Sequence, residues 1–136
     1  MVQNLMEAKE NHRLSFFACP FLCTASPGWD MPLSFVELLS GLDLTITKGD
    51  ANYRRLVGDL HWPFETSMHQ VLESCCLQSL ICRYFPCPLL LMRTLKSDVC
   101  IGVNHNLQEL ANKLDQSWSH DGKFGVIQFY HPSHCK

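Results

Sequence analysis

The sequence predicts an α/β fold in which a largely parallel sheet lies between layers of helices. Residues 42–47 alternate apolar and polar side chains, the period-two pattern of a strand with one apolar face. Residues 89–92 form a continuous apolar run, which is typical of a parallel strand buried on both faces. Apolar residues at helical spacing occupy 33–39 and 68–75, so helices and strands are expected to alternate along the chain.

The boundaries of the expected helices follow from capping and stop residues. Ser40 and Gly41 end the helix at 33–39. Asp50 is predicted to cap a helix at 51–57, and Gly58 to end it. Thr66 or Ser67 is expected to cap the helix at 68–75.

The last third of the chain predicts one more helix and a closing strand. Leu107, Leu110 and Leu114 recur at helical spacing after Asn106, which is the expected cap, and their apolar face is expected to pack in the core. Residues 125–130 are rich in β-branched and aromatic side chains and predict the closing strand.

Composition limits the size and the class of the protein. With 136 residues, 46% of them hydrophobic, and a net charge of −2, the chain is expected to form a single domain with a modest core over residues 1–136. Its 11 Lys and Arg are spread among 13 acids, which argues against a nucleic-acid partner. Its apolar runs are too short to cross a bilayer, so no membrane partner is expected.

The first residues could be mistaken for a secretory signal, but we expect a cytoplasmic protein. Glu7 and Glu10 are acidic where a leader is basic, and Pro20 interrupts the apolar run. The eight cysteines follow no regular spacing, and 73–83, which holds three of them, is interpreted as a local insertion. We expect reduced cysteines that act as small apolar residues. A zinc site is the less favoured alternative, drawn from Cys19, Cys23, His131, His134 and Cys135.

Residues 46–59 carry the strongest functional pattern in the chain. A strand, Gly49 and a helix start follow one another, and free backbone amides at a helix start favour a phosphate. Arg54 would reinforce that preference. Asp50 would repel a phosphate unless a cation or a sugar hydroxyl lay between them. Taken alone, the pattern fits a capped surface helix equally well.

A second polar group follows the second predicted strand. The Thr94 hydroxyl can donate to a phosphate oxygen, and the Lys96 ammonium can neutralise its charge. Because the carboxyl ends of parallel strands form the ligand-binding edge of an open sheet, both groups are expected to share one site. The alternative is that Arg93 and Lys96 form a solvated strand end.

Three motifs together resemble the metal-dependent damage-control phosphatases of subfamily III, also described as domain of unknown function 89. The resemblance covers about residues 14–129. The motifs are Lys48-Gly49-Asp50-Ala51-Asn52-Tyr53-Arg54-Arg55-Leu56 with Gly58-Asp59 and Trp62-Pro63, then Arg93-Thr94-Leu95-Lys96, and Gly122-Lys123-Phe124-Gly125-Val126-Ile127-Gln128-Phe129. In that family a strand and a loop like 24–32 precede the first motif.

The resemblance implies a fold, a site and a chemistry. It implies part of a three-layer, Rossmann-like α/β/α sheet, corresponding to the C-terminal part of a larger fold. The ligand is expected to be a small phosphorylated metabolite, of the fructose 1-phosphate or fructose 6-phosphate class, bound with Mn²⁺ or Ni²⁺. The implied substrate-binding residues are Asp50, Ala51, Asn52, Tyr53, Arg54 and Lys96, with Arg93 and Thr94 as supporting residues of the second motif.

The metal half of this implied site has no counterpart in the sequence. Family members supply the metal ligands from an Asp-Asn pair and another Asp upstream of the first motif, and here only Asp30 and Asp43 precede it, in different contexts. We therefore expect a substrate-binding half without metal ligands, and doubtful activity of the chain alone. Two alternatives stay open: an S-adenosylmethionine-dependent protein-carboxylate methyltransferase, and a non-catalytic remnant. Uncovered strands also predict association of the isolated chain.

Overall fold

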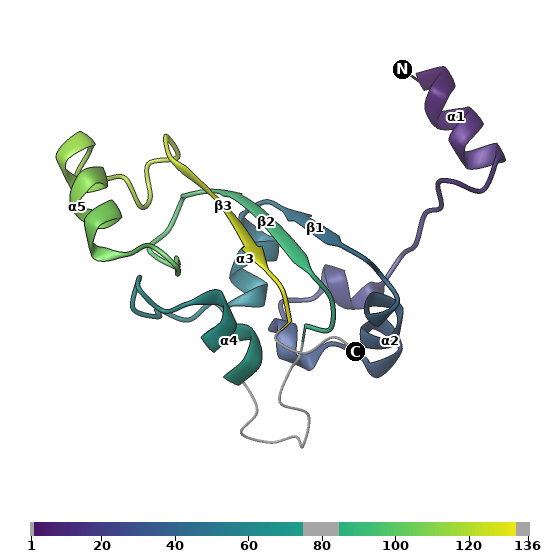
Figure 1. Ribbon diagram of the computed structural model, residues 1–136, viewed down its shortest axis with the longest axis horizontal. Coiled ribbons are helices and arrows are strands. Elements are labelled where there is room, and N and C mark those ends of the chain that lie inside the picture. Colours follow the sequence, from purple (N-terminus) through teal and green to yellow (C-terminus); the bar gives the residue numbers. More distant parts are fainter. Residues whose placement is uncertain (1, 75–84, 133–136) are drawn as a thin grey trace.

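The computed structural model describes residues 2–74 and 85–132 and shows a small sheet with helices around it (Figure 1). The described strands are β1 (Thr45–Lys48), β2 (Leu89–Thr94) and β3 (Gly125–Tyr130). The described helices are α1 (Val2–Glu10), α2 (Leu33–Ser40), α3 (Asp50–Leu56), α4 (Met68–Ser74) and α5 (His105–Leu114), with two short 3-10 helices, η1 (Pro20–Cys23) and η2 (Gly28–Asp30). The expected insertion at 73–83 lies mostly outside the described residues.

The sheet has the order β1-β2-β3. β1 and β2 are parallel, with Thr45 opposite Leu89 and Lys48 opposite Met92, whereas β3 runs antiparallel to β2. The α/β class is thereby confirmed. The parallel pair places the ends of β1 and β2 side by side, which is the arrangement expected for the two motifs.

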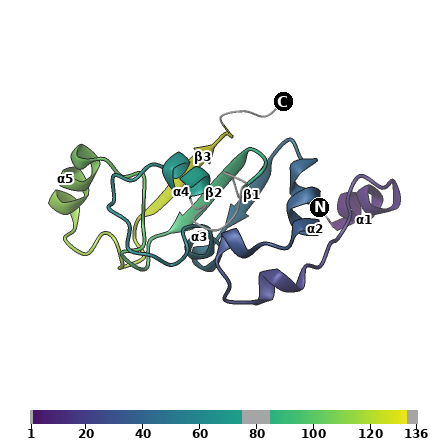
Figure 2. The ribbon, with the colours of Figure 1, turned by 90° about the horizontal axis from the view of Figure 1, so that it is seen from below.

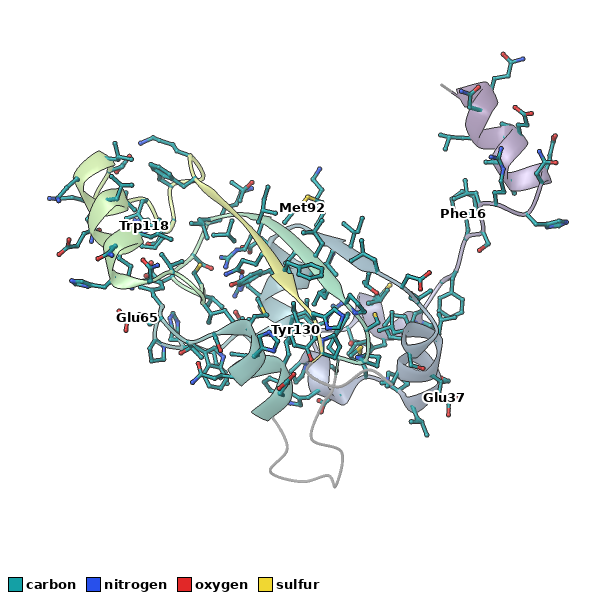
Figure 3. The ribbon with its side chains drawn as sticks, viewed as in Figure 1. Phe16, Glu37, Glu65, Met92, Trp118 and Tyr130 are labelled. Carbon is teal, nitrogen blue, oxygen red and sulfur yellow. The ribbon has the colours of Figure 1, made fainter. Side chains whose placement is uncertain are left out.

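In the described residues, helices cover one face of this sheet. Leu89, Leu91 and Tyr130 point to that face and pack with α3 and α4 in the main buried cluster. Figure 3 shows Tyr130 on the α4 side and Met92 on the other side of the sheet. On that other face Ile127 and Phe129 are 76% and 60% exposed, so the second helical layer of the expected fold is not seen in the described part.

The apolar side of the strand predicted at 42–47 does not face the core. β1 begins only at Thr45, and Thr45 and Thr47 point toward the helices while Ile46 is 58% exposed on the open face. Thr45 belongs to the helix-covered face because it pairs with buried Leu89, and neighbouring residues on paired strands share a face. The register of β1 against β2 therefore reverses the predicted orientation.

The strand that the resemblance placed before the loop at 24–32 is also absent from the described structure. Residues 14–19 are irregular, and η1 and η2 follow. Pro20 begins η1, where its missing N–H costs nothing, whereas the same residue would break a ladder of strand hydrogen bonds. α1, which the sequence analysis did not anticipate, stands apart from the body at the end of an extended segment (Figures 1 and 2).

The prediction that the apolar face of α5 packs in the core is wrong. Leu107, Leu110 and Leu114 are 51%, 54% and 67% exposed, because α5 extends beyond the end of the sheet (Figure 1). The cap was also misplaced by two residues. Asn104 has extended backbone angles and its side chain accepts a hydrogen bond of 2.9 Å from the Leu107 N–H, so it caps α5 in place of Asn106.

A second buried cluster anchors the base of α5. Trp118 packs with Leu95, Cys100 and Val103, and its indole N–H donates to Asn112 of α5 over 2.9 Å. The other expected elements are confirmed within one or two residues, including the Ser67 cap of α4, whose Oγ accepts from the Gln70 N–H. Within residues 2–74 and 85–132, no helix has the length and apolar character needed to span a membrane.

Candidate functional site

The first motif forms the turn from β1 into α3. Gly49 has φ = 106°, a backbone conformation that glycine adopts without strain, and its N–H donates to the Met92 carbonyl over 2.9 Å. This hydrogen bond ties the end of β1 to the end of β2. The start of α3 therefore lies level with the second motif.

Arg93 joins the two motifs through a buried guanidinium group. Its side chain is fully buried, and its Nε donates to Asp50 Oδ1 over 2.8 Å. Its remaining donors hold the loop that follows β2: Nη1 donates to the Val99 carbonyl, and Nη2 donates to Ser97 Oγ over 2.8 Å. Arg93 is thus neither a solvated strand end nor an open ligand-binding side chain, but the centre of the site's framework.

Tyr53 completes this framework from α3. Its ring centroid lies 4.7 Å from the Arg93 guanidinium carbon, and its hydroxyl accepts a hydrogen bond of 3.1 Å from the Ile101 N–H. The residue is 1% exposed, and burial raises the pKa of its hydroxyl well above the usual range. Its side chain therefore supports the site from within the core, and its role in substrate binding stays a prediction.

Asp50 does not cap α3 as predicted. It is the first residue of the helix, Gly49 is the N-cap residue, and the Asp50 carboxylate bonds to Arg93. A buried cation so close compensates the carboxylate, which removes most of the repulsion that Asp50 would exert on a phosphate. The presence of Asp50 is therefore compatible with the predicted phosphate-binding role of this helix start.

The other predicted site residues are solvent-accessible around this framework. Ala51, Thr94 and Lys96 are exposed, and Lys96 has no hydrogen-bond or ion-pair partner among the described residues. Asn52 is also exposed, but its side-chain amide donates to the Lys48 carbonyl over 3.0 Å. Lys96 is accordingly the cation of the second motif that is available to a ligand.

Arg54 is accessible at the other side of the helix start. Its side chain is 41% exposed, its Nη1 lies 3.7 Å from Asp50 Oδ2, and a short two-point contact joins it to Asp59. That contact raises the pKa of Arg54 and lowers the pKa of Asp59. The structure thus contains an alternating row of charges, Asp59, Arg54, Asp50 and Arg93.

Two hollows border these residues. One, of about 340 Å³, lies at the ends of β1 and β2 and is lined by Lys48, Gly49, Arg93 and Thr94 among others. The other, of about 310 Å³, lies between the loop at 24–27 and α3 and is lined in part by Thr24, Ala51, Arg54 and Asp59. The second hollow contains Ala51 and Arg54 of the predicted substrate-binding set. The first contains the supporting residues Arg93 and Thr94 together with apolar Met92, Val126 and Ile127.

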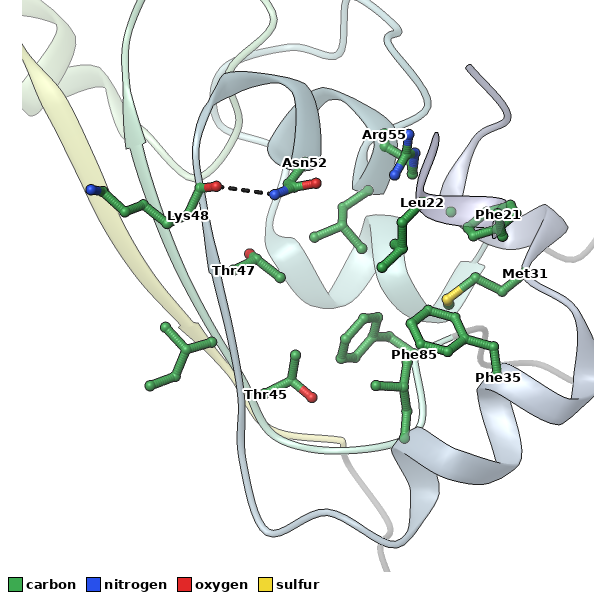
Figure 4. A pocket seen from close by; sticks show the side chains of 14 residues that line it. Phe21, Leu22, Met31, Phe35, Thr45, Thr47, Lys48, Asn52, Arg55 and Phe85 are labelled. Carbon is green, nitrogen blue, oxygen red and sulfur yellow. Dashed lines mark hydrogen bonds between the residues drawn. The ribbon is translucent and has the colours of Figure 1, made fainter. Parts of the chain in front are cut away.

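A third cavity, of about 240 Å³, has a different character (Figure 4). Its walls are mainly apolar and include Phe21, Leu22, Met31, Phe35 and Phe85. Asn52 donates to the Lys48 carbonyl and Arg55 Nη2 donates to the Thr24 carbonyl, whereas the buried Arg55 Nη1 has no hydrogen-bond partner among the described residues. The mainly apolar walls distinguish this cavity from the two hollows beside the motifs.

The described residues do not assemble a metal centre. No group of three or more His, Cys, Asp or Glu side chains in residues 2–74 and 85–132 is placed to hold an ion. Asp50 Oδ1 accepts a hydrogen bond from Arg93. This carboxylate oxygen is therefore already paired with a cationic side chain of the protein. The zinc alternative is incomplete, because His134 and Cys135 lie outside the described residues.

With this geometry in view, comparison with known proteins identifies the family. The family model described as "Damage-control phosphatase ARMT1-like domain" matches residues 2–110. The chain belongs to the damage-control phosphatase ARMT1-like family. The match includes both motifs that Arg93 holds together.

Curated relatives of this ARMT1-like chain carry the same description. "Damage-control phosphatase ARMT1" of Rattus norvegicus is 35% identical over 121 residues, which are 89% of this chain and 25% of that protein. The proteins of the same name from Danio rerio and Xenopus tropicalis are 33% and 38% identical, over 78% and 74% of this chain and 24% and 23% of their own length. The chain thus spans about a quarter of the length of the curated relatives it matches.

Sequence reasoning missed the structural roles of two residues. Arg93 was predicted as a supporting residue of the second motif or, alternatively, as part of a solvated strand end, since nothing in the pattern of β2 indicates that its fifth position is buried. Asp59 was included in the first motif, as part of Gly58-Asp59, without a role. Its signal in the sequence is the Gly58-Asp59 pair just after the helix, which favours a turn back toward the last helical residues.

Proposed function

We propose that this chain supplies the substrate-binding half of a metal-dependent phosphatase that acts on small sugar phosphates of the fructose 1-phosphate or fructose 6-phosphate class. One observation carries the proposal: the Arg93–Asp50 contact holds the two family motifs at the same edge of the sheet. Membership in the ARMT1-like family supports the phosphatase class. The substrate class rests on the resemblance of the motifs.

The accessible donors have the chemistry that a phosphate monoester requires. Arg54 presents a planar guanidinium and Lys96 a compact ammonium group. Thr94 adds a hydroxyl donor beside Lys96. The buried Arg93 acts on the substrate only indirectly, by fixing Asp50 and the loop that carries Ser97.

A divalent metal, Mn²⁺ or Ni²⁺, remains part of the proposal for a complete family member. Such an ion would polarise the phosphate and activate water. The described residues do not fit it, because their carboxylates are not grouped to bind an ion, so no step of the reaction is assigned to a metal here. This chain alone is therefore expected to bind substrate and to hydrolyse it poorly.

The proposal is tested by measuring binding and turnover separately. Isothermal titration of this chain with fructose 1-phosphate and fructose 6-phosphate should show binding that is weakened by Lys96→Ala and by Arg54→Ala. Phosphate release with Mn²⁺ or Ni²⁺ should require a longer family protein. In that protein, replacing the lysine at the position of Lys96 by alanine should lower the rate of phosphate release. Unchanged affinity and rate in the Lys96 variants would remove Lys96 from the site.

The methyltransferase alternative stays a prediction without a structural observation in its favour. Transfer of a methyl group from S-adenosylmethionine to glutamate side chains, measured with the longer protein, would decide it. The non-catalytic remnant, a chain that binds a ligand or a partner without catalysis, also stays a prediction.

A further inference from the structure

Asp59 makes a two-point contact with a residue of the proposed site. Its Oδ1 accepts from Arg54 Nε over 2.6 Å, and its Oδ2 accepts from Arg54 Nη2 over 2.8 Å. Two parallel hydrogen bonds of this kind fix the plane of a guanidinium as well as its position. The orientation of Arg54 is therefore set by a residue that follows the helix, outside the set that the motifs assigned to substrate binding.

The backbone places Asp59 there by an unusual turn. Gly58 and Asp59 both have positive φ, 69° and 56°, and the Asp59 N–H donates to the Arg54 carbonyl over 2.7 Å. A side chain at Gly58 would meet the ring of Trp29, so the turn is also held by close packing. Asp59 is thus attached to Arg54 through both the backbone and the side chain.

The contact leaves the opposite edge of the guanidinium available. Two of its five N–H groups bind Asp59, and Nη1 forms an ion pair with Asp50 at 3.7 Å from Oδ2, which is beyond hydrogen-bond distance. Nη1 and the second hydrogen of Nη2 can therefore donate to two oxygens of one ligand group. Arg54 lines a hollow of about 310 Å³ together with Ala51 and Asp59.

We propose that Asp59 is a positioning residue that orients Arg54 so that its free guanidinium edge binds the substrate phosphate. The inference rests on the proposed function and deepens it. A flexible arginine would lose side-chain freedom when it binds, and Asp59 reduces that loss by holding the side chain beforehand. The opposing interpretation is that Asp59 takes up hydrogen-bond donors of Arg54 and competes with the phosphate for them.

A double-mutant cycle distinguishes the two interpretations. The affinity of fructose 6-phosphate is measured by titration calorimetry for the full chain, Asp59→Asn, Arg54→Ala and the double variant. We expect Asp59→Asn to weaken binding about fivefold, as ordering one long side chain would. In the Arg54→Ala background the same change should leave affinity unaltered, because Asp59 acts only through Arg54.

Three results would overturn the inference. Tighter binding by Asp59→Asn would show competition, unchanged binding would show no role, and an equal loss in both backgrounds would show a structural effect unrelated to Arg54. Asp43→Asn is the matched control, since Asp43 is exposed and has no ion pair among the described residues. It should leave affinity unchanged.

A ligand-free measurement separates this inference from the proposed function. The rate at which phenylglyoxal modifies Arg54, followed by mass spectrometry, should rise in Asp59→Asn and stay constant in Asp43→Asn. If the full chain binds neither sugar phosphate, the proposed function fails for this chain. Arg54 positioning is then decided by the modification rate, and an unchanged rate in Asp59→Asn would refute it.

Discussion

At the residue scale, Arg93 and Lys96 separate two tasks within one short motif. Arg93 is fully buried and bonds to Asp50, to Ser97 and to the Val99 carbonyl, whereas Lys96 is exposed. A buried cation is stabilising only while its partners are in place. The first residue of the motif therefore maintains the site, and the last is available to a ligand.

This division predicts unequal effects of two substitutions on stability. Arg93→Ala should lower the free energy of unfolding by about 3–5 kcal/mol, because it leaves the Asp50 carboxylate and two acceptors of the 97–99 loop without their donor. Lys96→Ala should change it by less than about 0.5 kcal/mol. Urea denaturation followed by tryptophan fluorescence measures both. Equal losses in the two variants would contradict the separation of tasks.

The buried hydroxyl of Tyr53 and thiol of Cys100 predict an alkaline limit to stability. Burial raises the pKa of both groups in the folded chain. The unfolded chain loses these protons first, near pH 8.5 for the thiol and about pH 10 for the hydroxyl. The free energy of unfolding should thus be independent of these groups at lower pH and should fall as pH rises through that range.

Melting temperatures between pH 8 and 11 test this limit. Tyr53→Phe and Cys100→Ala should each reduce the slope of stability against pH, although each lowers stability at pH 7 through lost contacts. Cys23→Ala, at an exposed position, serves as the control and should keep the slope of the parent chain. A parent chain whose stability does not change up to pH 11 would rule out the prediction.

At the scale of elements, the end of α3 depends on a glycine that packs against an aromatic ring. Gly58 combines φ = 69° with a site where an added Cβ would lie 1.8 Å from the Trp29 ring. Gly122 has φ = 82° but open space at the same position. The two glycines therefore share a backbone requirement and differ in packing.

Alanine at these two positions should have unequal costs. Gly122→Ala should lower the free energy of unfolding by about 1–2 kcal/mol for the left-handed conformation alone. Gly58→Ala adds the displacement of Trp29, a further ~1–3 kcal/mol, and disturbs the turn that carries Asp59. Chemical denaturation compares them. If the two variants lose the same free energy of unfolding within error, the Trp29 ring can move aside without strain.

At the scale of the whole molecule, two apolar surfaces are uncovered in the described part. One is the open face of the sheet, with Ile46, Ile127 and Phe129, and the other is the leucine stripe of α5. Apolar surface of this extent favours association. Both edges of the described sheet are also open, because β1 and β3 each pair on one side only.

We therefore expect the isolated chain to self-associate, as its strand pattern predicts. Multi-angle light scattering should detect oligomers at micromolar concentration, and Ile127→Lys with Phe129→Lys should shift the mass toward the monomer. Leu60→Lys is the control, since Leu60 is exposed but lies after α3, away from the open sheet face. A parent chain that is a monodisperse monomer would overturn this expectation.

The sequence by itself determined the α/β class, the positions of α2, α3, α4, β2 and β3, and the two motifs at strand ends. These follow from local periodicity, from glycine and proline, and from capping residues, which act within a few residues of chain. The motif match was also sufficient to assign the family. None of these conclusions needed a contact between distant segments.

Only the tertiary structure decided which way side chains face and which polar groups meet. The register of β1 with β2 turned Ile46 outward, and the place of α5 beyond the sheet left its leucines exposed. The burial of Arg93, its bond to Asp50 and the two-point contact of Asp59 with Arg54 join residues through folding of the chain. The periodicity of a segment indicates which of its side chains can be buried. The neighbouring elements determine which of them are buried and which cation each acidic side chain pairs with.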